Sequence, residues 1–196
     1  MTQKQRLFLA LQALAAAAIL TPSAQAQNAS ASTQFTVTGT APNICVLPSP
    51  VTTGTANNAT FASNTVNITQ FVNQNTALVN ASNLSLQFPG TLCNYNATVS
   101  IQSKSGGLVS ANASTVASGS GAFLQSVPYT VNATWGSVNL TLDTSTANGS
   151  SLTVTAPTNG ATSGNLTLAF ATQASSLPVP QGTYQDTVTV KIGASM

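Results

Sequence analysis

Apolar and polar residues alternate with a period of two through most of the chain after residue 33. Because successive side chains of a β-strand point to opposite faces, this pattern predicts strands with one buried face. Turn-forming residues separate the stretches, among them Pro89-Gly90, and no helical period follows residue 26. We therefore predict an all-β fold, an antiparallel sandwich or barrel. The alternating or β-branched stretches are 34–41, 65–72, 83–88, 96–103, 128–135, 138–143, 151–156, 164–172 and 183–192.

The closing stretch, 183–192, is the most regular and is expected to form a single half-buried strand. The residues that share its apolar face are Tyr184, Asp186, Val188, Val190 and Ile192. A partly buried carboxylate has to accept hydrogen bonds. We expect backbone N–H groups of a neighbouring loop to donate them to Asp186.

The first 26 residues have the features of a secretory signal peptide. Lys4 and Arg6 precede an apolar run from Leu7 to Leu20, and Ala24-Gln25-Ala26 provides small residues for a signal peptidase. The run is shorter than the roughly 20 residues that a transmembrane helix needs. We predict that residues 1–26 are a cleaved signal peptide and that the exported chain has no membrane insertion.

Removal of this segment leaves a chain with almost no charge. Lys104 and Lys191 balance Asp143 and Asp186, so the formal charge is zero. Nucleic acids require dense Lys and Arg to neutralise phosphates, so no nucleic acid is expected as a partner. An uncharged surface avoids repulsion between copies, which suits an assembled structure and makes a free monomer prone to association.

The residues of common catalytic motifs are missing. The chain has no His, hence no Ser-His-Asp triad, and it has no P-loop or dinucleotide fingerprint. Asp143 follows a strand-like stretch and is expected in an Asx turn. We predict no enzyme activity, no cofactor and no metal. Four aromatic residues could form a sugar-binding platform, although single aromatic residues in alternating strands are more often core: Tyr95, Tyr129, Trp135 and Tyr184.

Cys45 and Cys93 are the two cysteines of the chain. Export would place them in an oxidising compartment, where disulfides persist. A reactive thiol and a metal site are the alternatives, but a metal site needs further ligands that this chain offers poorly. We predict a Cys45–Cys93 disulfide.

Several short motifs follow one another in a distinctive order. They are "PNIC" ending at Cys45, the segment Leu84 to Leu108 with "SKSGGL" at its end, "VPYTVNATW" from Val127 to Trp135, and the terminal Gly182-x-Tyr184-x-Asp186. In this order the chain resembles the spore coat protein U family, which is similar to the pilin subunits of archaic chaperone-usher pili. The resemblance covers most of the exported chain.

The resemblance implies an immunoglobulin-like β-sandwich that lacks its last strand. Residues 42–196 would form this domain, and the closing strand would border an open groove as its groove-edge strand. A periplasmic chaperone would fill the groove first, and a neighbouring pilin subunit would later replace it at an outer-membrane usher. The chain would pass through the periplasm to a surface fimbria or be secreted. No cofactor is implied.

The N-terminal segment 27–41 would then be the donor strand for another copy. Its alternating face consists of Phe35, Val37, Gly39 and Ala41. The alternative is an ordinary first strand of a complete domain. The functions expected are a structural fimbrial subunit or, alternatively, a secreted adhesive or glycan-binding module, or a coat or matrix protein of the same fold.

Overall fold

The computed structural model describes residues 32–117, 121–147 and 149–194. The signal peptide that the sequence predicts lies outside these residues. The chain divides into two compact units, Met1–Thr40 and Ala41–Met196. In the first unit, the described residues 32–40 form no helix or strand. The second unit contains all the described strands.

These strands are short, apart from two long strands in the middle of the larger sheet. Their bounds are β1 (Cys45–Val46), β2 (Val51–Asn57), β3 (Ala59–Ala62), β4 (Thr65–Ile68), β5 (Ser82–Cys93), β6 (Thr98–Ser103), β7 (Leu108–Ser110), β8 (Ser126–Val127), β9 (Tyr129–Trp135), β10 (Val138–Asp143), β11 (Leu152–Pro157), β12 (Thr162–Thr172), β13 (Tyr184–Gln185) and β14 (Val188–Gly193). One 3₁₀ turn, η1 (Thr144–Thr146), follows β10. Among the described residues, no helix is long and apolar enough to cross a membrane.

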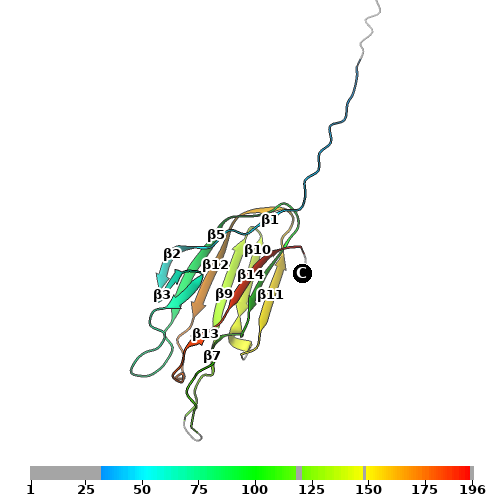
Figure 1. The fold of residues 1–196 in the computed structure, drawn as a ribbon. Coiled ribbons are helices and arrows are strands. Elements are labelled where there is room, and N and C mark those ends of the chain that lie inside the picture. The colour runs from blue at the N-terminus through cyan, green and yellow to red at the C-terminus, as the bar shows by residue number, and fades with distance from the viewer. Residues whose placement is uncertain (1–31, 118–120, 148, 195–196) are drawn as a thin grey trace, which may run out of the picture. The chain divides into compact units, whose positions relative to one another are not determined.

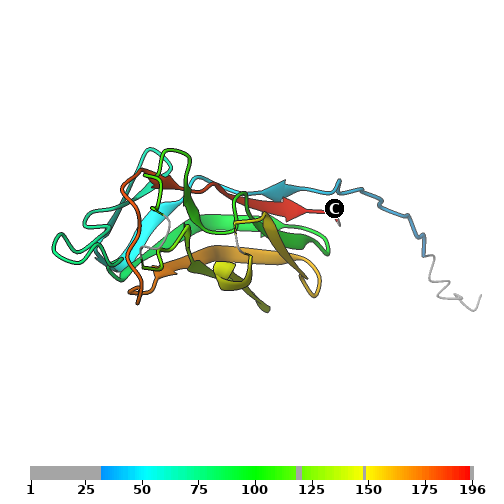
Figure 2. The ribbon, with the colours of Figure 1, turned by 90° about the horizontal axis from the view of Figure 1, so that it is seen from below.

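The strands form an antiparallel β-sandwich, which confirms the predicted fold class. The larger sheet has the order β1-β5-β12-β9-β10, and β2 also pairs with β5. The opposing layer has the order β11-β6-β14, and a small sheet has the order β13-β7-β8. Strands β3 and β4 form a separate hairpin. Figure 1 labels most of these strands, and Figure 2 shows β12 (orange) and β14 (red) in different layers.

The core lies between the layers and follows the period-two pattern of the sequence. The larger sheet contributes alternate residues of β5, β12, β9 and β10, and β6 contributes Val99 and Ile101, both completely buried. Burying one such side chain contributes about 1.5 to 3 kcal/mol. The inward residues of the larger sheet are Leu84, Leu86, Phe88, Leu166, Leu168, Tyr129, Val131, Ala133, Trp135, Val138 and Leu142.

Pro89-Gly90 is not the turn that the sequence predicts, because both residues lie inside β5. The pairing register between β12 and β5 shifts between Gly164 and Leu166, which is a β-bulge. Gly90 has φ of +71°, and its N–H bonds to Oδ1 of Asn165 at 3.2 Å. A residue pair typical of turns here bends one long strand instead of ending it.

The closing stretch is also not a single strand. Its first part, β13, pairs with β7, whereas β14 pairs with β6. The break falls at Asp186 and Thr187, where the Asp186 side chain binds a loop between β6 and β7. The two halves on either side of this contact belong to different sheets. Separately, residues 34–41 form no strand, in contrast to the prediction.

The predicted disulfide is confirmed: Cys45 and Cys93 are bonded, with their Cα atoms 4.2 Å apart. The two cysteines are also directly opposite each other in the pairing of β1 with β5. Strand β1 has only two residues, so the covalent bond supplements a short ladder. The bond closes a loop with a sequence separation of 48 residues, and in the chain-entropy model such a bond contributes about 4 kcal/mol.

We predict that replacing both cysteines by Ser lowers the free energy of unfolding of the chain without residues 1–26 by about 4 kcal/mol, because the unfolded chain gains conformational freedom. Urea unfolding of the wild-type and double-variant chains measures this difference. The wild-type chain treated with reductant is the matched control and should resemble the variant. Equal urea midpoints for oxidised and reduced wild-type chains would contradict the prediction.

Candidate functional site

A groove of about 980 Å³ runs along one side of the sandwich, between β13 and β14 on one wall and the β3–β4 hairpin on the other. Its apolar floor belongs to the inner face of the larger sheet. The floor residues are Leu86, Phe88, Tyr129, Val131, Leu168 and Phe170. The groove therefore gives access to side chains of the core itself.

Strand β14 is the last strand of its sheet, and within the described residues no strand pairs with its second edge. Val188 is directly opposite Ser103 in the register, so the two side chains share the inner face. Ser103 is completely buried, whereas Val188 is 37% exposed. Val190 and Ile192, on the same face, are half-buried. The inner face of β14 therefore lacks the cover that β6 has.

The opposite side of the groove is formed by the β3–β4 hairpin and by residues just before β2. Thr52 of β2 is directly opposite Leu86 in the register and shares its inward face, but Thr52 is exposed. The hairpin contributes Phe61 and Val66, which pack half-buried against the core. Pro50, which has no N–H, precedes β2 and also lines the groove. This wall therefore consists of half-buried hairpin residues and of Pro50 before β2.

At one end of the groove, the Asp186 carboxylate accepts five hydrogen bonds. Two come from side-chain hydroxyls and three from backbone N–H groups. The donors are Ser103 Oγ, Tyr129 Oη at 2.7 Å, Ser105 N at 2.9 Å, Gly107 N at 3.3 Å and Thr187 N at 2.6 Å. The expected backbone donors from a neighbouring loop are present. The hydroxyl of Tyr129 was not predicted, because its strand is far from Asp186 in sequence.

The loop that binds Asp186 depends on two glycines. Gly106 has φ of +60°, and a Cβ atom there would lie 1.9 Å from the carbonyl oxygen of Ser150. Gly107 has φ of +137°. These conformations are unfavourable for residues with a side chain. The glycines allow the loop to turn tightly enough for the N–H groups of Ser105 and Gly107 to reach one carboxylate.

The hydrogen bonds determine the ionisation of this cluster. Burial raises the pKa of the Asp186 carboxyl, but the donors Ser103, Tyr129, Ser105 and Thr187 together lower it below its ordinary value of 3.8. Burial also raises the pKa of Tyr129. Tyr129 therefore stays a hydroxyl donor and Asp186 stays an anion at neutral pH.

The structure does not bring the aromatic residues together as a sugar-binding platform. Tyr129 and Trp135 are 2% and 1% exposed and belong to the core. Tyr95 is half-buried against the same core. Tyr184 packs on Phe71 with ring centroids 5.2 Å apart, and its hydroxyl bonds to the carbonyl of Pro180.

The proposed donor residues lie mainly in the first unit. Phe35 and Val37 are 85% and 82% exposed. Gly39 and Ala41 are exposed as well. The large apolar side chains of Phe35 and Val37 are exposed to solvent in the single chain, which is unfavourable unless a partner covers them.

Comparison with protein-family models, with curated proteins and with solved structures found no match. A function for this chain therefore has to follow from its groove and its side chains.

Among the described residues, no three His, Cys, Asp or Glu side chains lie close enough to hold a metal ion.

We predict that Asp186→Asn lowers the free energy of unfolding by about 1.5 to 3 kcal/mol, because an amide directs an NH₂ group at existing donors. The wild-type contribution should be complete above pH 3.8 and decline as the pH falls through the lower pKa of the folded state. Urea unfolding between pH 2.5 and 7 measures both effects.

Asp143→Asn is the matched control for this variant. Asp143 is exposed and accepts one hydrogen bond, from Ser145 N at 2.9 Å, which an Asn oxygen can also accept. This variant removes the same charge, and its stability should stay close to that of the wild type. Equal losses from both variants would assign the effect to net charge instead of the hydrogen bonds.

Proposed function

We propose that this chain is a structural subunit of a surface fibre, whose groove is filled by a β-strand from another chain. The observation that carries the proposal is the groove itself. An apolar floor made of core residues lies beside β14, whose second edge has no partner among the described strands. An added strand would cover the exposed Val188 and pair with the open edge.

A strand fits this groove better than a small molecule does. The groove extends from the hairpin to β14 over part of the inner face, and the main chain of the β14 edge beside it can form hydrogen bonds. Exposed edges of this kind promote aggregation unless they are paired. Strand addition satisfies the edge and covers the apolar floor in one step.

The chain itself contains a suitable donor in residues 34–41. Phe35 and Val37 alternate with threonines, so one face of an extended segment would be apolar and the other polar. Both side chains are exposed. Burying each in a groove would contribute about 1.5 to 3 kcal/mol, in addition to main-chain hydrogen bonds.

Repeated donation from copy to copy would build a fibre. Before assembly the groove needs a temporary partner, the role that the resemblance to archaic pilins gives to a periplasmic chaperone, with an outer-membrane usher as the site of exchange. Donor and groove belong to one sequence, which favours a homopolymer. A signal peptide and a disulfide fit such an exported subunit.

We predict that Phe35→Asp and Val37→Asp abolish fibre growth, because a carboxylate in an apolar groove costs several kcal/mol. Deleting residues 34–41 should have the same effect. Electron microscopy of fibre length, with each variant mixed into wild-type chains, measures the result.

Thr36→Asp is the matched control, since it adds the same charge to the opposite face of the segment. It should leave fibre length close to the wild-type value. Equal damage at positions 35, 36 and 37 would contradict the period-two interpretation. Normal fibres from the deletion would show assembly by another contact.

We also predict that Val188→Lys on the groove side blocks fibre growth while the chain still folds, because this side chain is already 37% exposed. Thr189→Lys, on the outer face of the same strand, is the control and should assemble. Size-exclusion chromatography with electron microscopy separates the two variants. Normal fibres from Val188→Lys would place the assembly contact outside the groove.

A further inference from the structure

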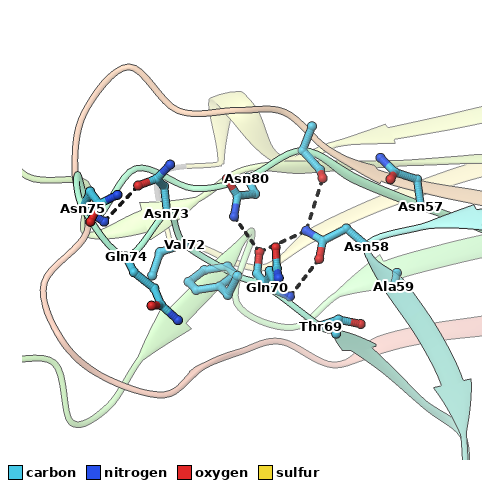
Figure 3. A pocket seen from close by; sticks show the side chains of 12 residues that line it. Asn57, Asn58, Ala59, Thr69, Gln70, Val72, Asn73, Gln74, Asn75 and Asn80 are labelled. Carbon is cyan, nitrogen blue, oxygen red and sulfur yellow. Dashed lines mark hydrogen bonds between the residues drawn. The ribbon is translucent and has the colours of Figure 1, made fainter.

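A second cavity, of about 960 Å³, lies between the end of β2 and the loop 69–81. Amide side chains dominate its lining, and no charged residue is among them (Figure 3). The lining residues are Asn57, Asn58, Ala59, Thr69, Gln70, Phe71, Val72, Asn73, Gln74, Asn75, Asn80 and Ala81. We call this cavity the amide pocket.

Asn58 and Asn80 hold the amide pocket in shape. Asn58 Nδ2 donates to the carbonyl oxygens of Gln70 and Ala81, at 3.0 and 3.3 Å, and its Oδ1 accepts from Gln70 N at 2.7 Å. Asn80 Nδ2 also donates to the Gln70 carbonyl, at 2.9 Å. Figure 3 shows the bonds from Asn58 and Asn80 that meet at Gln70. The side-chain amides of Asn58 and Asn80 thus fix the backbone around the amide pocket, and we call them its frame.

The loop behind the pocket is anchored to the sandwich. Val72 and Val79 form a β-bridge, and so do Leu78 and Pro178. Val79 is 1% exposed in a small apolar cluster. The backbone of this loop is therefore held in place before a ligand binds, so only the lining side chains have to be ordered on binding.

Other amides of the lining have no such structural role. Within the described residues, the side chains of Asn57, Gln70 and Gln74 form no hydrogen bonds, and all three residues are exposed. An amide offers both an acceptor oxygen and a donor NH₂ group. Phe71 adds a half-buried apolar ring to the same lining.

These groups match the chemistry of sugars. A sugar hydroxyl both donates and accepts, as an amide does, and the C–H face of a sugar ring suits an aromatic surface. The absence of Lys and Arg from the lining leaves no partner for a uronate or sulfate group. The volume is at the upper end of the range of small-ligand pockets, which allows more than one sugar unit.

We propose that the amide pocket binds an uncharged saccharide, with Gln70 and Gln74 as contact residues. The pocket is built from residues 57–59, 69–75 and 80–81. It does not include β14 or the donor segment. The inference therefore does not rest on strand addition, and the fibre and the saccharide site can be tested separately.

The test uses the exported full chain and a panel of oligosaccharides of glucose, mannose, galactose and N-acetylglucosamine, with oligogalacturonate as the charged probe. Isothermal titration calorimetry should detect at least one uncharged probe and no binding of oligogalacturonate. Gln70→Ala combined with Gln74→Ala should weaken the bound probe at least tenfold. Val188→Lys should keep wild-type affinity.

Asn139→Ala combined with Gln173→Ala is the matched control, because it removes two exposed amides outside the pocket. This control should bind the probe as the wild type does. Urea unfolding of both double variants checks that the fold is intact. Failure of every uncharged probe to bind, equal binding of oligogalacturonate, or unchanged affinity of the Gln70 and Gln74 double variant would overturn the proposal.

Discussion

The hydrogen bonds of the Asp186 carboxylate position the parts of the molecule on which the groove depends. They join the end of the chain to the loop 103–107 and to Tyr129 in the floor of the groove. Because the carboxylate is held at this point, β13 turns to β7 and β14 continues along β6. The anchored side chain thus lies just before the strand whose second edge is unpaired among the described strands. Few charged groups occur in this chain, and this one is retained where several donors satisfy it.

A second constraint on the structure is that the buried core ends at β14, an edge strand whose inner positions are only partly covered. The inner positions of β6 are closed, but those of β14 are partly exposed, so the sandwich is well packed on one side of the groove and poorly covered on the other. Natural sheets often protect such edges with charged residues. Here Lys191 is the one charged residue of β14, and it is paired opposite Ser100 on the outer face. A chain with so little protection on an edge strand is well suited to accept a strand from a partner.

The sequence was sufficient to predict the features that depend on local pattern or on counting. The alternation of apolar and polar residues predicted most strands and their inward faces. The two cysteines allowed a single disulfide, and the Asp186 carboxylate on an apolar face required hydrogen-bond donors. The features that were missed depend on contacts between distant residues. Pro89-Gly90 is a bulge because β12 pairs across it, and the last strand is broken because Asp186 meets Gly107 and Tyr129. The amide pocket could not be predicted, since its frame joins Asn58 to Gln70 and Ala81 of a loop whose course is not encoded in a local pattern.

Phe71 lines both the groove and the amide pocket. Its ring packs on Tyr184 of β13, and β13 precedes the Asp186 anchor directly. Phe71 therefore lies between the two cavities. Its ring contacts Tyr184, which belongs to the strand that ends at the break in the closing stretch. The cavities nevertheless differ in chemistry. The floor of the groove consists mainly of apolar core residues, which suits the alternate apolar side chains of a strand, whereas the amide pocket presents uncharged donors and acceptors, which suit hydroxyl groups. A fold with almost no charge thus has two chemically different hollows, because one is floored by core residues and the other is lined partly by amides without hydrogen-bond partners among the described residues.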